Sequence, residues 1–193
     1  MESIEQKIKR ISGESFSIEE YNPEYPGLFL REKQYLLAIL PDLLVKRIEH
    51  FGSTAIPNMT GKPIIDMLVE VSSLEKTKEV IVPILEAKGY DYLWRPSWGD
   101  DTPPFYAWFI KRNSSGERTH HIHMVEKSFE HWDRLLFRDY LIEHANVAKE
   151  YANLKNKLFS AGNSDRVEYT QKKGDFIKAV TETAIRYYSN VEK

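Results

Sequence analysis

We expect the fold to be organised around two segments, EHFGST at residues 49–54 and KPIID at residues 62–66. The first segment ends a short strand that is predicted from Arg47 to Phe51, and Gly52-Ser53 breaks this strand. After a tight turn, the second segment opens a more apolar strand that is predicted from Ile64 to Val71. These two strands and the turn between them form the expected centre of the molecule.

The turn and the strand that follows it carry the residue types of a phosphate site. Glycine has no Cβ, so backbone N–H groups at Gly52 and Ser53 can approach an anion closely. Asp66 stands in an otherwise apolar strand, where a lone carboxylate is costly unless it is paired or binds a cation. Two interpretations of Asp66 are open, a salt bridge to a neighbouring Lys or Arg and a metal ligand. The nearby turn favours the metal ligand.

The composition is that of an ordinary soluble protein, with 41% hydrophobic and 29% charged residues. A formal net charge of −2 gives no overall basic field that would recruit nucleic acid. The absence of cysteine excludes disulfides, thiolate nucleophiles and Cys-based metal sites. No apolar run approaches the ~18 residues of a membrane span, and the first residues lack a signal-peptide pattern. We therefore expect a soluble, cytoplasmic protein with no membrane association.

The order of the predicted elements indicates an α+β fold with a mixed β-sheet flanked by helices and a helical C-terminal part. Helices are predicted at residues 22–40, 74–88, 129–143, 145–160 and 165–188, the last with Asp165 as its N-cap. Further strands are predicted at residues 90–94, 105–111 and 117–125, with a loop at 95–104 and a hairpin that pairs onto the Ile64 strand. A single domain is expected over residues 1–193, with an α/β core at 17–128 and a helical subregion at 129–193.

A histidine cluster, HHIH at residues 120–123, is the second candidate for chemistry. On a strand, His121 and His123 point to one face while His120 and Ile122 point to the other. Two imidazoles at i and i+2 can hold a divalent ion or grip a phosphate. The alternative, a hydrogen-bonded pair on a half-buried sheet, has equal weight.

Four other residues could join these groups. Arg118 would share the face of His120 in a regular strand and is a candidate phosphate clamp. His50, directly before the Gly-Ser turn, could aim into the same cleft. Tyr169 and Lys173 lie at i and i+4 of the predicted last helix and can contact a base or a phosphate. The pattern favours the plainer alternative for this pair, a surface pair over a core aromatic residue.

These motifs together resemble the signature of the GrpB family over roughly residues 17 to 180. The resemblance is carried by HFGSTAIP at 50–57, KPIID at 62–66, HIH at 121–123, FRDYL at 137–141, and by Tyr169, Lys173 and Phe176. That family in turn resembles the nucleotidyltransferase superfamily. The resemblance implies a nucleotidyltransferase-like α+β fold, in which a short mixed sheet is covered by helices.

The working pattern of that superfamily is a Gly-Ser turn, a strand with two carboxylates two residues apart, and a third carboxylate on a later strand. Gly52-Ser53 and Asp66 match it, but position 68 is Leu and the later strand offers His121 and His123. Two-metal phosphoryl transfer needs several hard oxygen ligands to hold Mg²⁺ at ~2.1 Å. Either the histidines complete a site for a softer ion such as Mn²⁺ or Zn²⁺, or catalysis has been lost and binding remains.

The sequence therefore predicts a nucleotidyltransferase-like enzyme that acts on a nucleotide or phosphorylated metabolite through a divalent metal, Mn²⁺, Mg²⁺ or Zn²⁺. The predicted metal ligands are Asp66, His121 and His123, and the predicted catalytic residues are Asp66, Lys62 and Arg118. The predicted phosphate-binding residues are Gly52, Ser53, Thr54, Tyr169 and Lys173. If the histidines complete the site, activity is expected with Mn²⁺ or Zn²⁺ and should fall below about pH 6, where imidazoles protonate and cease to be ligands. The alternatives are a non-catalytic module that binds the same ligands and a His-Asp metal-dependent hydrolase.

Overall fold

The centre of the structure, a computed structural model that describes residues 4–97, 102–160 and 166–191, is a five-stranded mixed sheet. The strands are β1 (Val45–Phe51), β2 (Ile65–Val71), β3 (Asp91–Pro96), β4 (Phe105–Arg112) and β5 (Arg118–Val125). Their order in the sheet is β1-β2-β5-β4-β3. The β2–β5 pair is parallel and the other neighbours are antiparallel. The two central strands therefore come from distant parts of the chain.

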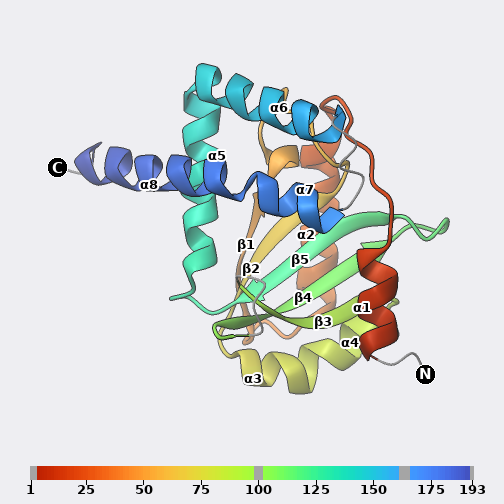
Figure 1. The fold of residues 1–193 in the computed structure, drawn as a ribbon. Helices are drawn as coiled ribbons and strands as arrows, with labels where there is room; N and C mark the ends of the chain where they lie inside the picture. The colour runs from red at the N-terminus through yellow and green to blue at the C-terminus, as the bar shows by residue number, and fades with distance from the viewer. Residues whose placement is uncertain (1–3, 98–101, 161–165, 192–193) are drawn as a thin grey trace.

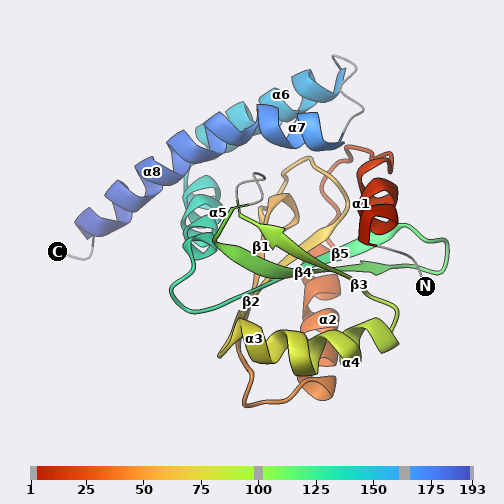
Figure 2. The same ribbon diagram turned by 60° about the horizontal axis from the view of Figure 1, so that its bottom comes forward.

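Helices cover both faces of this sheet. They are α1 (Ile4–Ser12), α2 (Tyr25–Ile39), α3 (Leu74–Lys76), α4 (Val82–Ala87), α5 (Asp133–Glu143), α6 (Ala145–Ser160), α7 (Arg166–Lys172) and α8 (Gly174–Val191). Figures 1 and 2 show α2, α3 and α4 on one side of the sheet and α1 with α5 to α8 on the other. The far end of α8 reaches beyond the sheet toward the C-terminus. Within the described ranges, no helix is both long enough and apolar enough to cross a bilayer.

The central strand β2 is apolar on both faces because both faces are covered by helices. Met67 is fully buried in the cluster that contains Leu36 of α2. Leu68 points the other way and is fully buried with Trp108, toward α1 and α5. Since side chains alternate along a strand, Asp66 shares the face of Leu68. The strand thus delivers one carboxylate to the side of the sheet where the helical C-terminal part lies.

The α+β prediction is confirmed, and so is the pairing of the predicted hairpin onto the Ile64 strand through the β2–β5 ladder. The helix predicted at residues 74–88 contains a π-helical turn, Thr77–Ile81. This turn ends two residues before Pro83, whose missing N–H cannot continue an α-helical ladder. The prediction of one helix at 165–188 is wrong, because α7 ends at Lys172 and α8 begins at Gly174. Glycine is unfavourable inside a helix, and the helix is interrupted at this point. The predicted cap Asp165 and part of the predicted loop, 98–101, lie outside the described residues.

A buried carboxylate ties α2 to the opposite edge of the sheet. Glu32 of α2 is 3% exposed and accepts hydrogen bonds from the Tyr90 hydroxyl, just before β3, and from Lys111 Nζ of β4. Removing water from a carboxylate is costly, so these two donors are what makes its burial tolerable. This contact attaches α2 to the face of the sheet opposite the one that carries Asp66.

We predict that Tyr90→Phe lowers the free energy of unfolding by about 1–3 kcal/mol, because the buried Glu32 carboxylate then keeps a single donor. Denaturation in urea measures this loss. Tyr187→Phe on α8, where the ring is 39% exposed, is the matched control and should change stability by less than about 0.5 kcal/mol. Equal stabilities of the two variants would contradict this account of Glu32.

Candidate metal and phosphate site

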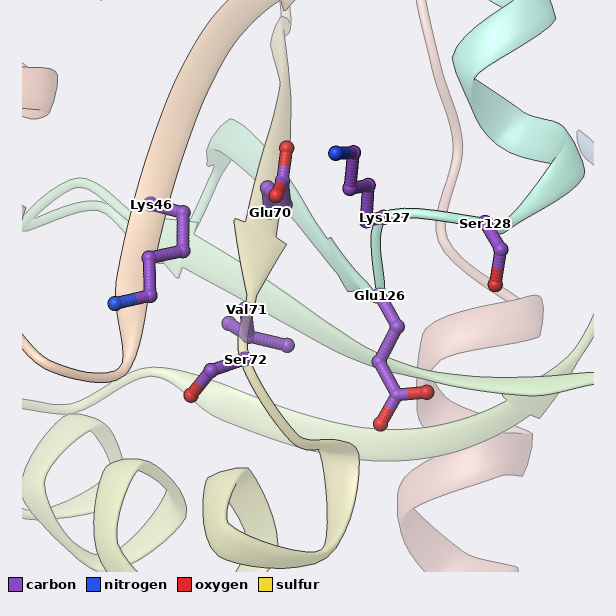
Figure 3. A pocket seen from close by; sticks show the side chains of 7 residues that line it. All are labelled: Lys46, Glu70, Val71, Ser72, Glu126, Lys127 and Ser128. Carbon is purple, nitrogen blue, oxygen red and sulfur yellow. The ribbon is translucent and has the colours of Figure 1, made fainter.

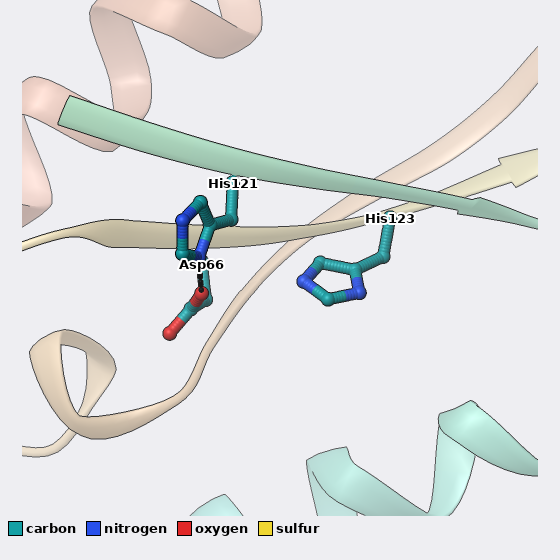
Figure 4. Close-up of side chains that lie close together, drawn as sticks. All are labelled: Asp66, His121 and His123. Carbon is teal, nitrogen blue, oxygen red and sulfur yellow. Dashed lines mark hydrogen bonds and ion pairs between the residues drawn. The ribbon is translucent and has the colours of Figure 1, made fainter. Parts of the chain in front are cut away.

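Three potential metal ligands meet on one face of the sheet. The β2–β5 register pairs Asp66 with His121 and Leu68 with His123, so the carboxylate and both imidazoles lie on the same face (Figure 4). Their ligand atoms all lie within 4.8 Å of one another, and His121 Nδ1 is 3.2 Å from Asp66 Oδ1. The predicted convergence of these three side chains is therefore confirmed, while their binding of a metal stays a prediction.

The donor set fits one ion of the softer kind. One carboxylate and two imidazoles are common ligands of Zn²⁺ and also suit Mn²⁺. His123 Nδ1 is buried and has no hydrogen-bond partner in the described part of the chain, so a ligand atom is available there. Leu68, where a nucleotidyltransferase-like pattern would require a second carboxylate, is fully buried in the apolar core. The strand therefore cannot supply the oxygen ligands of a paired Mg²⁺ site.

His123 sits among aromatic rings. Phe51 meets it edge-on at 5.1 Å between ring centroids, and Tyr106 stacks on it at 5.4 Å. Burial, and then the positive charge of Arg134, lower the pKa of His123 well below its usual range. Both effects disfavour protonation of His123, and the expected loss of activity below about pH 6 stays a prediction.

The Gly-Ser turn lies directly against the carboxylate. Gly52 has a φ of +74°, a backbone conformation that residues with a Cβ rarely adopt. A Cβ at this position would lie 2.3 Å from Asp66 Oδ2. Only glycine fits here, for both reasons. The predicted anion cradle and the predicted metal carboxylate are thus in contact.

The neighbouring polar residues support the turn. Thr54 is buried, and its hydroxyl donates to the carbonyl of Ile64 at 3.2 Å. His50 Nε2 lies 3.0 Å from the same hydroxyl oxygen, and its ring stacks on Phe29 of α2 at 4.8 Å. His50 therefore points to the α2 face, and the suggestion that it aims into the cleft is wrong. Burial lowers the pKa of His50 to about 4, so it remains a neutral hydrogen-bonding group.

Arg118 lies away from this cluster. Its Nε donates to Glu14 Oε2 at 2.5 Å and its Nη2 donates to the carbonyl of Ile11, so it holds the end of α1 on the sheet. The β4–β5 ladder shifts register beside Thr119, and this irregularity turns Arg118 away from the face of His120. The structure thus gives Arg118 an anchoring contact and does not bring it to Asp66.

Tyr169 lies close to two lysines that the sequence predicts at the site, Lys62 and Lys173. Its ring is 1% exposed and lies 4.9 Å from Lys62 Nζ and 5.1 Å from Lys173 Nζ. It also packs on Phe16, with ring centroids 5.0 Å apart. The plainer interpretation of Tyr169 as part of a surface pair is therefore wrong. Burial lowers the pKa of Lys173, and the negative charge of Asp66 acts in the opposite direction.

Two further cations lie at the site and were missed in the sequence. Lys155 of α6 is 1% exposed, and its Nζ donates to Ser53 Oγ at 3.0 Å and to the carbonyl of Thr60. Arg134 of α5 is half-buried, and after burial its charge is a main reason why the pKa of His123 is lowered. The one available signal for Lys155 was its i+4 spacing from Tyr151, which marks the buried face of α6.

A surface hollow of about 730 Å³ lies at the other end of β2 (Figure 3). It is lined by Lys46, Glu70, Val71, Ser72, Glu126, Lys127 and Ser128. These residues carry charges of both signs, and Asp66 is not among them. We therefore assign the candidate site by the converging side chains rather than by this hollow.

Residues 15–183 match the family model described as GrpB protein. The chain belongs to the GrpB family. It is 40% identical over 169 residues to the UPF0157 protein YqkA of Bacillus subtilis (strain 168), covering 86% of this chain but 46% of that relative. It is 35% identical over 161 residues to the glutamate-rich protein GrpB of Alkalihalophilus pseudofirmus, covering 83% of this chain and 90% of that relative.

A solved GrpB structure has the same fold. The crystal structure of the conserved protein GrpB from Enterococcus faecalis superposes with a TM-score of 0.73 at 31% identity, covering 89% of this chain and 99% of that one. The family resemblance seen in the sequence is thus confirmed. The names of these GrpB relatives state no reaction, so the chemistry has to be argued from the site.

We predict that Lys155 makes the stability of the free protein depend on pH. Burial lowers its pKa to about 7, whereas an unfolded lysine has a pKa of about 10.4. Below about pH 7 both states are protonated and the cost of burying the charge is complete. As the pH rises between the two pKa values, the unfolded chain binds more protons and the folded state gains stability. Relative to Lys155→Met, the wild type should gain about 2 kcal/mol between pH 7 and pH 9.

Urea unfolding at each pH measures this difference. Lys157→Met is the matched control, because Lys157 lies on the same helix and is exposed. It should follow the wild-type pH profile. Parallel profiles for Lys155→Met and the wild type would contradict the lowered pKa of Lys155.

Proposed function

We propose that this chain is a nucleotidyltransferase-like protein that binds a nucleotide or phosphorylated metabolite through one divalent metal ion. The observation that carries the proposal is the meeting of Asp66 with His121 and His123, directly against the turn at Gly52. A carboxylate with two imidazoles suits a cation, and a glycine turn next to it suits an anion. A ligand whose phosphate is bridged by a metal satisfies both.

The surrounding cations support a phosphorylated ligand. Arg134 of α5 and Lys173, in the break between α7 and α8, both interact with the negative charge of Asp66. Lys62 lies with Lys173 around the ring of Tyr169. Because unlike charges attract strongly in a poorly hydrated site, this excess of positive charge favours a ligand with several negative charges. A bound metal ion would add charge neutralisation and polarise a phosphoryl oxygen. The residues of the chain would bind and orient the phosphate against the turn.

One observation favours a second candidate function, a module that binds the ligand without turnover. Leu68 replaces a carboxylate and is fully buried, so a second metal has no ligand on β2. Ordinary Mg²⁺-dependent nucleotidyl transfer depends on such a ligand. Any transfer by this chain would therefore depend on Mn²⁺ or Zn²⁺ at the histidine site.

We predict that the wild type binds one Mn²⁺ or Zn²⁺ ion per chain and that Asp66→Asn weakens this binding at least tenfold, because the amide keeps the shape but loses the charge. Calorimetric titration of the metal-free protein measures the affinity. Glu70→Gln is the matched control, since Glu70 lies on the same strand and face of the sheet, beyond the buried Leu68. It should leave the affinity unchanged. Equal metal affinity in Asp66→Asn and the wild type would exclude the proposed centre.

The second test separates an enzyme from a binding module. Nucleoside triphosphates are incubated with candidate acceptors and either Mg²⁺, Mn²⁺ or Zn²⁺, and pyrophosphate release is measured. We predict little or no release with Mg²⁺, and any release with Mn²⁺ or Zn²⁺ should be lost in Asp66→Asn. Robust Mg²⁺-dependent transfer that survives in a His121→Ala, His123→Ala double variant would overturn the assignment. Binding without release under any metal would support the module.

A further inference from the structure

Lys155 is a buried cation without a buried anion to match it. Its side chain is 1% exposed, and within the described ranges no carboxylate lies within ion-pair distance of its Nζ. Its hydrogen bonds go to two neutral oxygens, Ser53 Oγ and the carbonyl of Thr60. A buried ammonium is normally paired with an anion, since neutral acceptors replace only part of its hydration. This arrangement therefore lacks a negative partner.

The position of Lys155 points to where such a partner would bind. Gly52 lies against Asp66, and the next residue, Ser53, accepts the hydrogen bond from Lys155. The metal carboxylate and the buried ammonium thus flank one two-residue turn. Because Lys155 donates to Ser53 Oγ, the proton of the serine hydroxyl remains available to donate to a ligand oxygen.

A second glycine lets the chain pack closely against Ser53 and this lysine. A Cβ at Gly61 would lie 2.7 Å from Ser53 Cβ and 3.5 Å from Lys155 Nζ. Gly61 is held in place by two backbone hydrogen bonds with Glu19, of 2.9 and 3.0 Å. A larger residue at position 61 would therefore displace Ser53, which accepts the hydrogen bond from Lys155.

A second lysine lies on the neighbouring part of the helical layer: Lys173 Nζ is 5.1 Å from the ring centroid of Tyr169 on α7, and α7 packs against α6, which carries Lys155. Burial is the main cause of the lowered pKa of Lys155, and the positive charge of Lys173 lowers it further. Two lysines that repel each other are brought together by α6 and by the break between α7 and α8. Repulsion of this kind is relieved when a multiply charged anion binds between the two groups.

We propose that Lys155, Lys173 and the Ser53 hydroxyl form a subsite for a second phosphate, so that the ligand carries at least two linked phosphates. The inference rests on the proposed function, which places the first phosphate at the metal centre beside Gly52. The second phosphate then lies one residue further along the turn, where it is the negative partner that Lys155 lacks. A ligand with one phosphate satisfies the metal centre and leaves the lysine pair unmatched.

The experiment compares orthophosphate with pyrophosphate as probes, each titrated calorimetrically into the Mn²⁺-loaded protein. The wild type should bind pyrophosphate at least about tenfold more tightly than orthophosphate, because hydrogen bonds to charged groups contribute strongly. In Lys155→Met this preference should fall to about twofold or less, while the affinity for Mn²⁺ alone stays unchanged. Lys157→Met on the exposed side of α6 is the matched control and should keep the preference.

The outcomes separate this inference from the proposed function. A full pyrophosphate preference in Lys155→Met, with Mn²⁺ binding intact, overturns the subsite and leaves the metal centre standing. A wild type that binds neither Mn²⁺ nor phosphate overturns both. If Lys155→Met does not fold, Lys173→Met decides, since the half-buried Lys173 contributes to the same subsite. Its preference should also fall at least about fivefold, and an unchanged preference overturns the subsite.

Discussion

The parallel pairing of β2 with β5 is the constraint on which the candidate site depends. It sets Asp66 opposite His121 and Leu68 opposite His123, so one carboxylate and two imidazoles share a face. A slip by one residue would send both imidazoles to the α2 side, because side chains alternate along a strand. The register is held by packing on both faces, with Met67 in one core cluster and Leu68 in the other.

The same packing explains the unusual ligand set. A carboxylate at position 68 would have to lie in the apolar cluster that contains Phe51 and Trp108, where losing its hydration is costly. The face has instead been built from aromatic rings around His123. Apolar surroundings keep an imidazole neutral and so favour it as a metal ligand, whereas they would disfavour a second carboxylate. Core and ligand chemistry are therefore consistent with one another.

Rules of local structure, such as side-chain alternation along a strand, were enough to predict the features that depend on nearby residues. The alternation along two strands predicted that Asp66, His121 and His123 would share a cleft, and the special conformation of glycine predicted the turn at Gly52. The α+β order followed from the periodicity of the chain and from its turn residues. The face that each side chain occupies and the turn depend on neighbours within a few residues, whereas the meeting of Asp66 with His121 also needs the pairing of two strands from distant parts of the chain.

The predictions failed for side chains whose positions depend on contacts between distant parts of the chain. Arg118 was placed by regular alternation, but the bulge beside Thr119 redirects it to Glu14. Lys155 looks like any other lysine of a mixed helix, and only the packing of α6 over the turn buries it against Ser53. The sequence shows at most that Lys155 shares a helix face with Tyr151, and it shows neither contact partner.

The contact between Lys155 and Ser53 has a consequence for how the molecule folds. The two residues are separated by 102 positions along the chain, and Thr60 is separated from Lys155 by 95. Closing such long loops costs chain entropy before any contact repays it, which slows folding. The β4–β5 hairpin and the helices need only nearby partners. The chain should therefore form this hairpin and its helices early and complete the contact of Lys155 with the turn late in folding.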